Sequence, residues 1–178
     1  MFDRKYFIPA IGKNRMADYL SVILYDARCM TFTYIKGITQ AELDWQPFDG
    51  WNTVGALLSH IVAAENYFRI KFLEGRELSE EEKSILPAIE LGKNVNKLKG
   101  RSPKYYHAEL LAAHNAMKKV VQNMPDEKLL HARYDMYDYV NGCNLAWILY
   151  HGAEDEVHHR GQISIIRKLY KKRKGGNL

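Results

Sequence analysis

Three residues near the end of the chain are spaced so that they could bind one metal ion. His151, Asp155 and His159 follow one another at intervals of four residues, and residues four apart on an α-helix lie above one another on the same face. A further candidate, His60, lies in an otherwise apolar segment. Imidazole and carboxylate groups are common ligands of divalent metals, and three protein ligands leave coordination positions open. The spacing therefore predicts a reactive metal site.

Helical geometry ranks these candidates. With His159 taken as the centre of the apolar face, Asp155 lies about 40° away and His151 about 80° away. Asp155 and His159 therefore point inward, where an unpaired carboxylate is costly. A divalent cation shared with His60 would stabilise Asp155, but a charge-assisted hydrogen bond to His159 would do so without a metal. The periodicity alone leaves both interpretations open.

The other histidines and the tyrosines carry weaker signals. His107 and His114 are seven residues apart and share one helical face, without an acidic partner nearby in the sequence. We expect both to occupy ordinary surface or boundary positions. We expect several tyrosines of the second half to form packing walls: Tyr105, Tyr106, Tyr134, Tyr137 and Tyr139.

Composition predicts a single globular domain over residues 1–178. The chain has 178 residues, of which 47% are hydrophobic and 12% aromatic, enough to bury a core. No apolar run approaches the roughly 18–20 residues that cross a bilayer, and the N-terminus lacks the apolar core of a secretory signal. Cys29 and Cys143 form no disulfide framework. We therefore expect a cytoplasmic protein that does not insert into membranes.

The net charge of +5 does not predict nucleic-acid binding once its location is considered. The basic residues gather in the connector around residues 93–104 and near the C-terminus, including the tail at 171–178. Aromatic residues do not alternate with them as a surface for single-stranded nucleic acid requires, and a basic cluster complements the negative end of a helix. We expect a solvated helix end and tail.

Four amphipathic segments predict an all-α protein. The helices are expected from Asn14 to about Ile35, from Asn52 or Thr53 to about Glu74, from Ser102–Pro103 to Val121, and from about Asn144 to Tyr170, with a short capped turn at 79–82 and an ordered connector over 129–142. The connector that carries Trp45 and Trp51 should fold over one end, because both indoles need burial. One long crossover connection completes a four-helix bundle.

Two longer motifs give the chain a resemblance to a known family. Residues 43–61 read LDWQPFDGWNTVGALLSHI and are followed by Glu65, and residues 154–163 read EDEVHHRGQI. Together they resemble the DinB-like, or YfiT-like, family of helical bundles, over roughly residues 14–172. The resemblance implies an up-down-down-up four-helix bundle, a homodimer, and a divalent metal held by one His of the second helix and two His of the fourth.

Carried over to this chain, the family's metal ligands fall on His60, Asp155 and His159. Asp155 stands where His is the common choice. Two imidazoles and one carboxylate suit Fe(II), Zn²⁺ or Mn²⁺, and Ni²⁺ is a further candidate. The departure leaves two alternatives: metal binding has been lost and Asp155 only contacts His159, or His151 supplies the missing imidazole.

The resemblance also implies an activity. Some members are S-transferases that use a low-molecular-weight thiol such as bacillithiol or mycothiol, whose thiol pKa a bound metal lowers so that the thiolate attacks an electrophile. Arg160 is a weak candidate for orienting an anionic thiol. The favoured prediction is that the protein is a detoxifying metal-dependent S-transferase or a related hydrolase. The alternative is a non-catalytic, stress-related dimeric binding protein with a degenerate metal site.

Overall fold

The computed structural model describes residues 15–92, 95–131, 133–136 and 142–175. Within these ranges the regular structure is helical, and the β-type pairing is an isolated bridge between Tyr134 and Cys143. The prediction of an all-α protein is confirmed. No helix in the described part of the chain has the length and apolar character needed to span a membrane.

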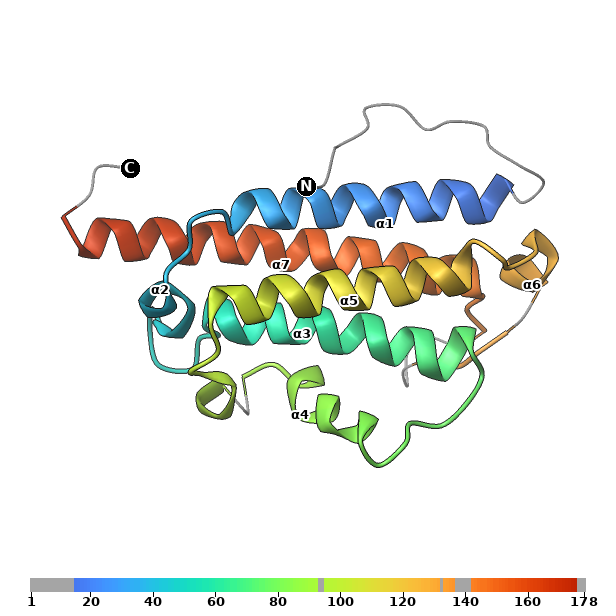
Figure 1. Ribbon diagram of the computed structural model, residues 1–178, viewed down its shortest axis with the longest axis horizontal. Coiled ribbons are helices and arrows are strands. Elements are labelled where there is room, and N and C mark those ends of the chain that lie inside the picture. Colours follow the sequence, from blue (N-terminus) through green and yellow to red (C-terminus); the bar gives the residue numbers. More distant parts are fainter. Residues whose placement is uncertain (1–14, 93–94, 132, 137–141, 176–178) are drawn as a thin grey trace.

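Four long helices lie along the long axis of the molecule (Figure 1). They are α1 (Arg15–Tyr34), α3 (Val54–Phe68), α5 (Pro103–Val121) and α7 (Leu145–Arg173). Helix α7 packs against α1 and α3, and α5 packs against α3 and α1. In Figure 1, α3 and α5 run in one direction and α1 and α7 run in the other. The chain therefore crosses back along the molecule between α3 and α5.

Side-chain caps begin three of these helices at the positions that the sequence indicates. The side chains of Thr53, Ser102 and Asn144 accept hydrogen bonds from backbone N–H groups three residues later, at 3.0, 3.1 and 2.8 Å. Each bond satisfies a donor that the first turn of a helix leaves unpaired. Of the two predicted starts of α3, the structure selects Thr53 as the cap. Helix α7 continues three residues beyond its predicted end at Tyr170, to Arg173.

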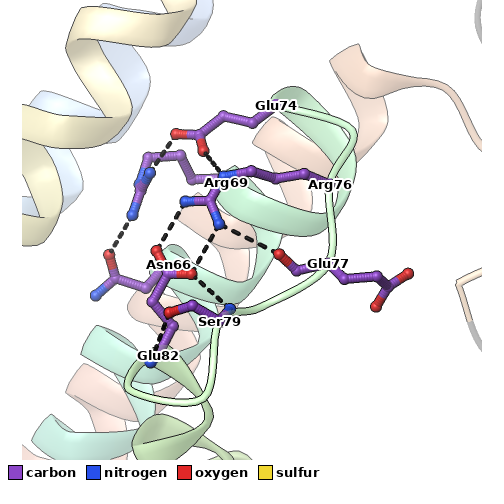
Figure 2. A network of polar contacts seen from close by, with 7 residues as sticks. All are labelled: Asn66, Arg69, Glu74, Arg76, Glu77, Ser79 and Glu82. Atoms are coloured by element: carbon purple, nitrogen blue, oxygen red, sulfur yellow. Dashed lines mark hydrogen bonds and ion pairs between the residues drawn. The ribbon is translucent and has the colours of Figure 1, made fainter.

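The C-terminal end of α3 changes its winding and leads into the crossover. A π-helical turn, η1 (Arg69–Leu73), follows α3 directly, and a polar network holds the next turn (Figure 2). Arg76 donates two hydrogen bonds to Glu82, both of 2.7 Å. Ser79 and Glu82 bond each other's backbone N–H at 2.9 and 3.2 Å, which confirms the predicted capped turn.

Short helices fill the connections between the long ones. The crossover contains η2 (Glu82–Ile85), α4 (Leu86–Ile89) and η3 (Val95–Leu98), and α6 (Asp126–His131) follows α5. Helix α2 (Gln40–Asp44) lies in the connector between α1 and α3. An ion pair of 3.0 Å between Glu42 of α2 and Arg167 fastens this connector to α7.

The two tryptophans of that connector differ in burial. Trp45 is half-buried, and its ring contacts Tyr170 at a centroid distance of 5.4 Å. Trp51 is 43% exposed and contacts Phe48 instead. The prediction that both indoles are buried is therefore wrong for Trp51, because the connector turns this residue outward beside the start of α3.

A charged residue at the centre of the core joins all four long helices. Arg28 of α1 is 1% exposed, and its guanidinium contacts Glu65 of α3 at 2.7 Å and Glu156 of α7 at 2.9 and 3.1 Å. It also donates to the carbonyl oxygen of Leu110 in α5. We call Arg28, Glu65 and Glu156 the buried charge cluster. Because it ties α7 to α1 and α3, the cluster constrains the rotation of α7 about its axis.

Candidate metal centre

His60, Asp155 and His159 converge between α3 and α7. Nε2 of His60 lies 3.4 Å from Oδ2 of Asp155, and Nε2 of His159 lies 3.2 Å from Oδ1 of the same carboxylate. The ring centroids of the two histidines are 4.7 Å apart. One ligand atom from each of the three residues lies within 4.8 Å of the others. A single cation could therefore contact all three side chains.

Each histidine of the group makes a second hydrogen bond through Nδ1. Nδ1 of His60 lies 3.1 Å from the carbonyl oxygen of Ala88, and Nδ1 of His159 lies 2.9 Å from Oε1 of Gln162. A carbonyl oxygen only accepts hydrogen bonds, so Nδ1 is the donor in both rings. Nε2 of each ring faces Asp155 and donates to it when it carries a proton, and loss of that proton would free the Nε2 lone pair for a metal ion. This is the arrangement by which metal-binding histidines are oriented in proteins.

Electrostatics favour a charged pair in the group. Burial by itself disfavours ionisation of Asp155, but the hydrogen bonds from His159 and His60 outweigh it and hold the pKa of Asp155 below its ordinary value. Burial also lowers the pKa of His159, yet Asp155 and Gln162 raise it more, and the net shift is upward. Asp155 is therefore an anion near neutral pH, and a cation bound here would compete with the proton on His159.

The group is accessible from one side. The side chains of His60 and Asp155 are 13% and 21% exposed, whereas that of His159 is 6% exposed. Buried neighbours hold His159 on the interior side, and the surface of the group is formed by the other two residues. The outer face of the group is therefore partly exposed to solvent.

The donor set fits a divalent metal ion. Two imidazole nitrogens and one carboxylate oxygen form a recognised set for Zn²⁺ and Fe(II), and the Nδ1 partners orient both rings. When bound, the ion would be held by His60, Asp155 and His159.

The structure places the other two candidates elsewhere. His151 directs Nδ1 toward Glu154 at 3.1 Å and stacks on the ring of Trp147 at a centroid distance of 4.9 Å. Arg160 donates to the carbonyl oxygen of Ala27 at 3.3 Å and lies over the ring of Tyr34. Both side chains thus serve packing at the sides of α7.

The expectation for His114 is wrong, because this residue is buried in the core. It is 4% exposed, with Nδ1 3.9 Å from Glu65 and its ring against Tyr25. Burial and the nearby positive charge of Arg28 lower the pKa of His114 to about 4. His107, on the same helix, is exposed and packs against Phe32. The seven-residue spacing does not produce equal environments, because His114 lies between Tyr25 of α1 and Glu65 of α3 whereas His107 stays exposed beside Phe32.

Sequence reasoning missed the buried charge cluster and the role of Gln162. A void of about 10 Å³, roughly the space of one water molecule, is bordered by Arg28, Glu65, Glu156 and the metal-ligand candidate Asp155. Burial raises the pKa of Glu65 above its ordinary value although Arg28 opposes the shift. The sequence does indicate the cluster indirectly: a basic residue lies in the apolar stripe of α1, and acidic residues lie at inward positions of α3 and α7.

Fold and site together define a class: an all-α protein in which two long helices present a His–Asp–His group able to hold a metal ion. A comparison with family models places the chain more specifically, because the model of the DinB superfamily matches residues 23–163. This protein belongs to the DinB superfamily. The match includes all three residues of the group. No curated protein matched the sequence.

Proposed function

We propose that this protein binds a divalent metal ion through His60, Asp155 and His159 and joins a low-molecular-weight thiol, of the bacillithiol type, to an electrophile through the thiol sulfur. One observation carries the metal part of the proposal: the three ligand atoms lie within 4.8 Å of one another while Ala88 and Gln162 orient the two imidazoles. The thiol part is supported by the resemblance to those members of the DinB family that use such thiols.

The proposed reaction forms one carbon–sulfur bond. A bound divalent metal would lower the pKa of a coordinated thiol and so supply the thiolate near neutral pH. The C–S bond forms as the bond to the leaving group breaks, the leaving group takes the electron pair, and the thiol proton passes to water. The residues of the chain orient the site: His60 and Asp155 form its open side, and buried His159 keeps its place through Gln162.

Asp155 distinguishes this chain from the three-histidine pattern of its family. A carboxylate lowers the charge of the loaded site by one and is a harder ligand than imidazole. We therefore expect affinity for Mn²⁺ and Fe²⁺ beside Zn²⁺ and Ni²⁺. An Asp155→His variant should shift the preference toward Zn²⁺ relative to Mn²⁺.

The rival function is a non-catalytic, stress-related binding protein with a degenerate site. That function predicts a site closed by aromatic side chains. The partial exposure of His60 and Asp155 favours an accessible centre and hence the enzyme.

Metal content tests the proposal. The protein is purified without added metal or chelator and analysed by inductively coupled plasma mass spectrometry, together with His60→Ala, Asp155→Ala and the matched control His151→Ala. We expect nearly one metal ion per chain in the wild type and in His151→Ala, and loss in the other two. Absence of metal from the wild type, with no uptake of Zn²⁺, Fe²⁺, Mn²⁺ or Ni²⁺ on titration, would favour the degenerate site. Loss only in His151→Ala would assign the imidazole to that residue.

Three further features belong to the same proposal. The directions of the long helices in Figure 1 support an up-down-down-up four-helix bundle. A homodimer and a cytoplasmic location follow from family membership and composition, and both stay predictions. Size-exclusion chromatography with light scattering measures the first.

A further inference from the structure

A pocket of about 300 Å³ lies beside the candidate metal centre, between α3 and α7. Four apolar side chains form most of its wall: Trp51, Leu57, Ile165 and Ile166. Gly50 and two uncharged polar residues, Asn52 and Gln162, complete it. We call this feature the apolar pocket. Its volume is at the lower end of the range that holds small molecules, and it matches a ligand of one or two rings.

The lack of charge on the wall of the apolar pocket determines which ligands can bind there. Among the residues that the structure describes, none that lines the apolar pocket is charged. A charged group that entered it would lose hydration without gaining an opposite charge. Trp51 and Ile165 face it with 43% and 53% of their surfaces exposed, and apolar surface left in water around a hollow is typical of a binding site. The ligand part that fits is therefore apolar and uncharged.

Trp51 is held in place by its own loop. Nε2 of Gln46 donates to the carbonyl oxygen of Trp51 at 2.6 Å, and the ring of Phe48 packs edge-on at a centroid distance of 5.2 Å. The next residue, Asn52, accepts a hydrogen bond from the backbone N–H of Gly92 at 2.9 Å. A wall that is ordered before binding costs little entropy when the ligand arrives.

Gln162 joins the apolar pocket to the metal centre. Its Oε1 accepts the hydrogen bond from Nδ1 of His159, and the same side chain lines the apolar pocket. Leu57 precedes His60 by three residues on α3, just as Gln162 follows His159 by three on α7. A molecule in the apolar pocket is therefore separated from His159 by the side chain of Gln162 alone along this path.

We propose that the apolar pocket binds the aromatic or alkyl part of the electrophile and that Trp51 and Ile165 determine which electrophiles are accepted. The inference rests on the proposed S-transfer, and it assigns the two reactants to different places. An anionic thiol is excluded from the uncharged pocket and reaches the metal centre from its open side at His60 and Asp155, whereas the apolar part of the electrophile is held beside Gln162.

A binding measurement with two matched dyes tests the inference. N-phenyl-1-naphthylamine is neutral, and 8-anilinonaphthalene-1-sulfonate has the same ring systems with one negative charge. Each is titrated by fluorescence into the purified, metal-loaded protein and into Trp51→Ala, Ile165→Glu and Tyr150→Ala. Tyr150 is the control, because it is 51% exposed on α7 and lies outside the apolar pocket.

We expect the neutral dye to bind more tightly than the sulfonate, and both pocket variants to weaken it about tenfold. Tyr150→Ala should bind it like the wild type, and all three variants should keep their metal and helical circular dichroism. Equal affinity of Trp51→Ala, Ile165→Glu and wild type for the neutral dye would overturn the inference, as would tighter binding of the sulfonate. The titration needs neither thiol nor turnover, so its outcome is separate from that of the proposed S-transfer, which the metal analysis tests.

Discussion

Arg28 of α1 and Glu156 of α7 form a buried ion pair with two hydrogen bonds, from Nε to Oε1 at 2.9 Å and from Nη2 to Oε2 at 3.1 Å. Glu156 directly follows Asp155 in the sequence, so the pair sets the rotation of α7 at the point where it presents a candidate metal ligand. Neighbouring residues on a helix differ by about 100° in direction. One acidic residue can therefore face the core cluster while the other faces His60.

Removing Arg28 should destabilise the fold strongly. In Arg28→Met the carboxylates of Glu65 and Glu156 would stay buried without their cation, and such a loss typically costs about 3–5 kcal/mol. Urea unfolding followed by circular dichroism measures the free energy of unfolding. Lys71→Met, which removes an exposed ion pair with Glu77, serves as the control and should unfold near the wild-type midpoint. A wild-type midpoint for Arg28→Met would show that the cluster adds nothing to stability.

The buried His114 should make the protein sensitive to acid. Its pKa is lowered from 6.5 to about 4, so between these values the unfolded chain binds a proton that the folded chain does not. The free energy of unfolding therefore falls as the pH falls through this window, by up to about 3 kcal/mol at 1.4 kcal/mol per pH unit.

Unfolding in urea across this pH window, with a chelator present to remove metal effects, measures the slope. His114→Gln should flatten it, and His107→Gln, an exposed histidine of the same helix, should not. Equal slopes for wild type and His114→Gln would mean that other groups cause the acid sensitivity.

Gln162 should strengthen metal binding without being a ligand. In Gln162→Leu the Nδ1 of His159 loses its acceptor, and losses of this kind typically lower metal affinity about 10–100-fold. Gln162→Glu keeps an oxygen acceptor at this position and should retain most of the affinity. Competition for Zn²⁺ with a fluorescent chelator measures both variants. If Gln162→Leu binds as tightly as the wild type, the orientation of His159 must come from packing alone.

Two helical glycines should respond in opposite ways to the same substitution. A Cβ at Gly55 would lie 2.9 Å from the hydroxyl of Tyr106 and 3.2 Å from the backbone oxygen of Leu43, whereas a Cβ at Gly161 meets open space. Gly55→Ala should therefore cost about 1–3 kcal/mol, and Gly161→Ala should stabilise by up to about 1 kcal/mol. Thermal unfolding compares the pair, and a stabilising Gly55→Ala would show that α3 can move away from Tyr106 at little cost.

Helix caps and the direction of side chains on one helix can be predicted from local sequence. The caps at Thr53, Ser102 and Asn144 act on backbone groups only three residues away, so their effect is readable from the chain. The inward direction of Asp155 and His159 depends on the helical repeat of α7 alone. The proximity of His60 to these two residues depends on how α3 packs against α7, and in the sequence only the resemblance to a known family indicates it.

The sequence by itself determined the helices, their caps and the apolar face on which Asp155 and His159 lie, because these depend on neighbours within one or two helical turns. Only the tertiary structure decided which side chains meet across helices. It paired Arg28 with Glu65 and Glu156, buried His114, and left Trp51 exposed beside the apolar pocket. The angle of a residue on its own helix says which way it points, but what it contacts depends on the packing of residues that are distant in the sequence.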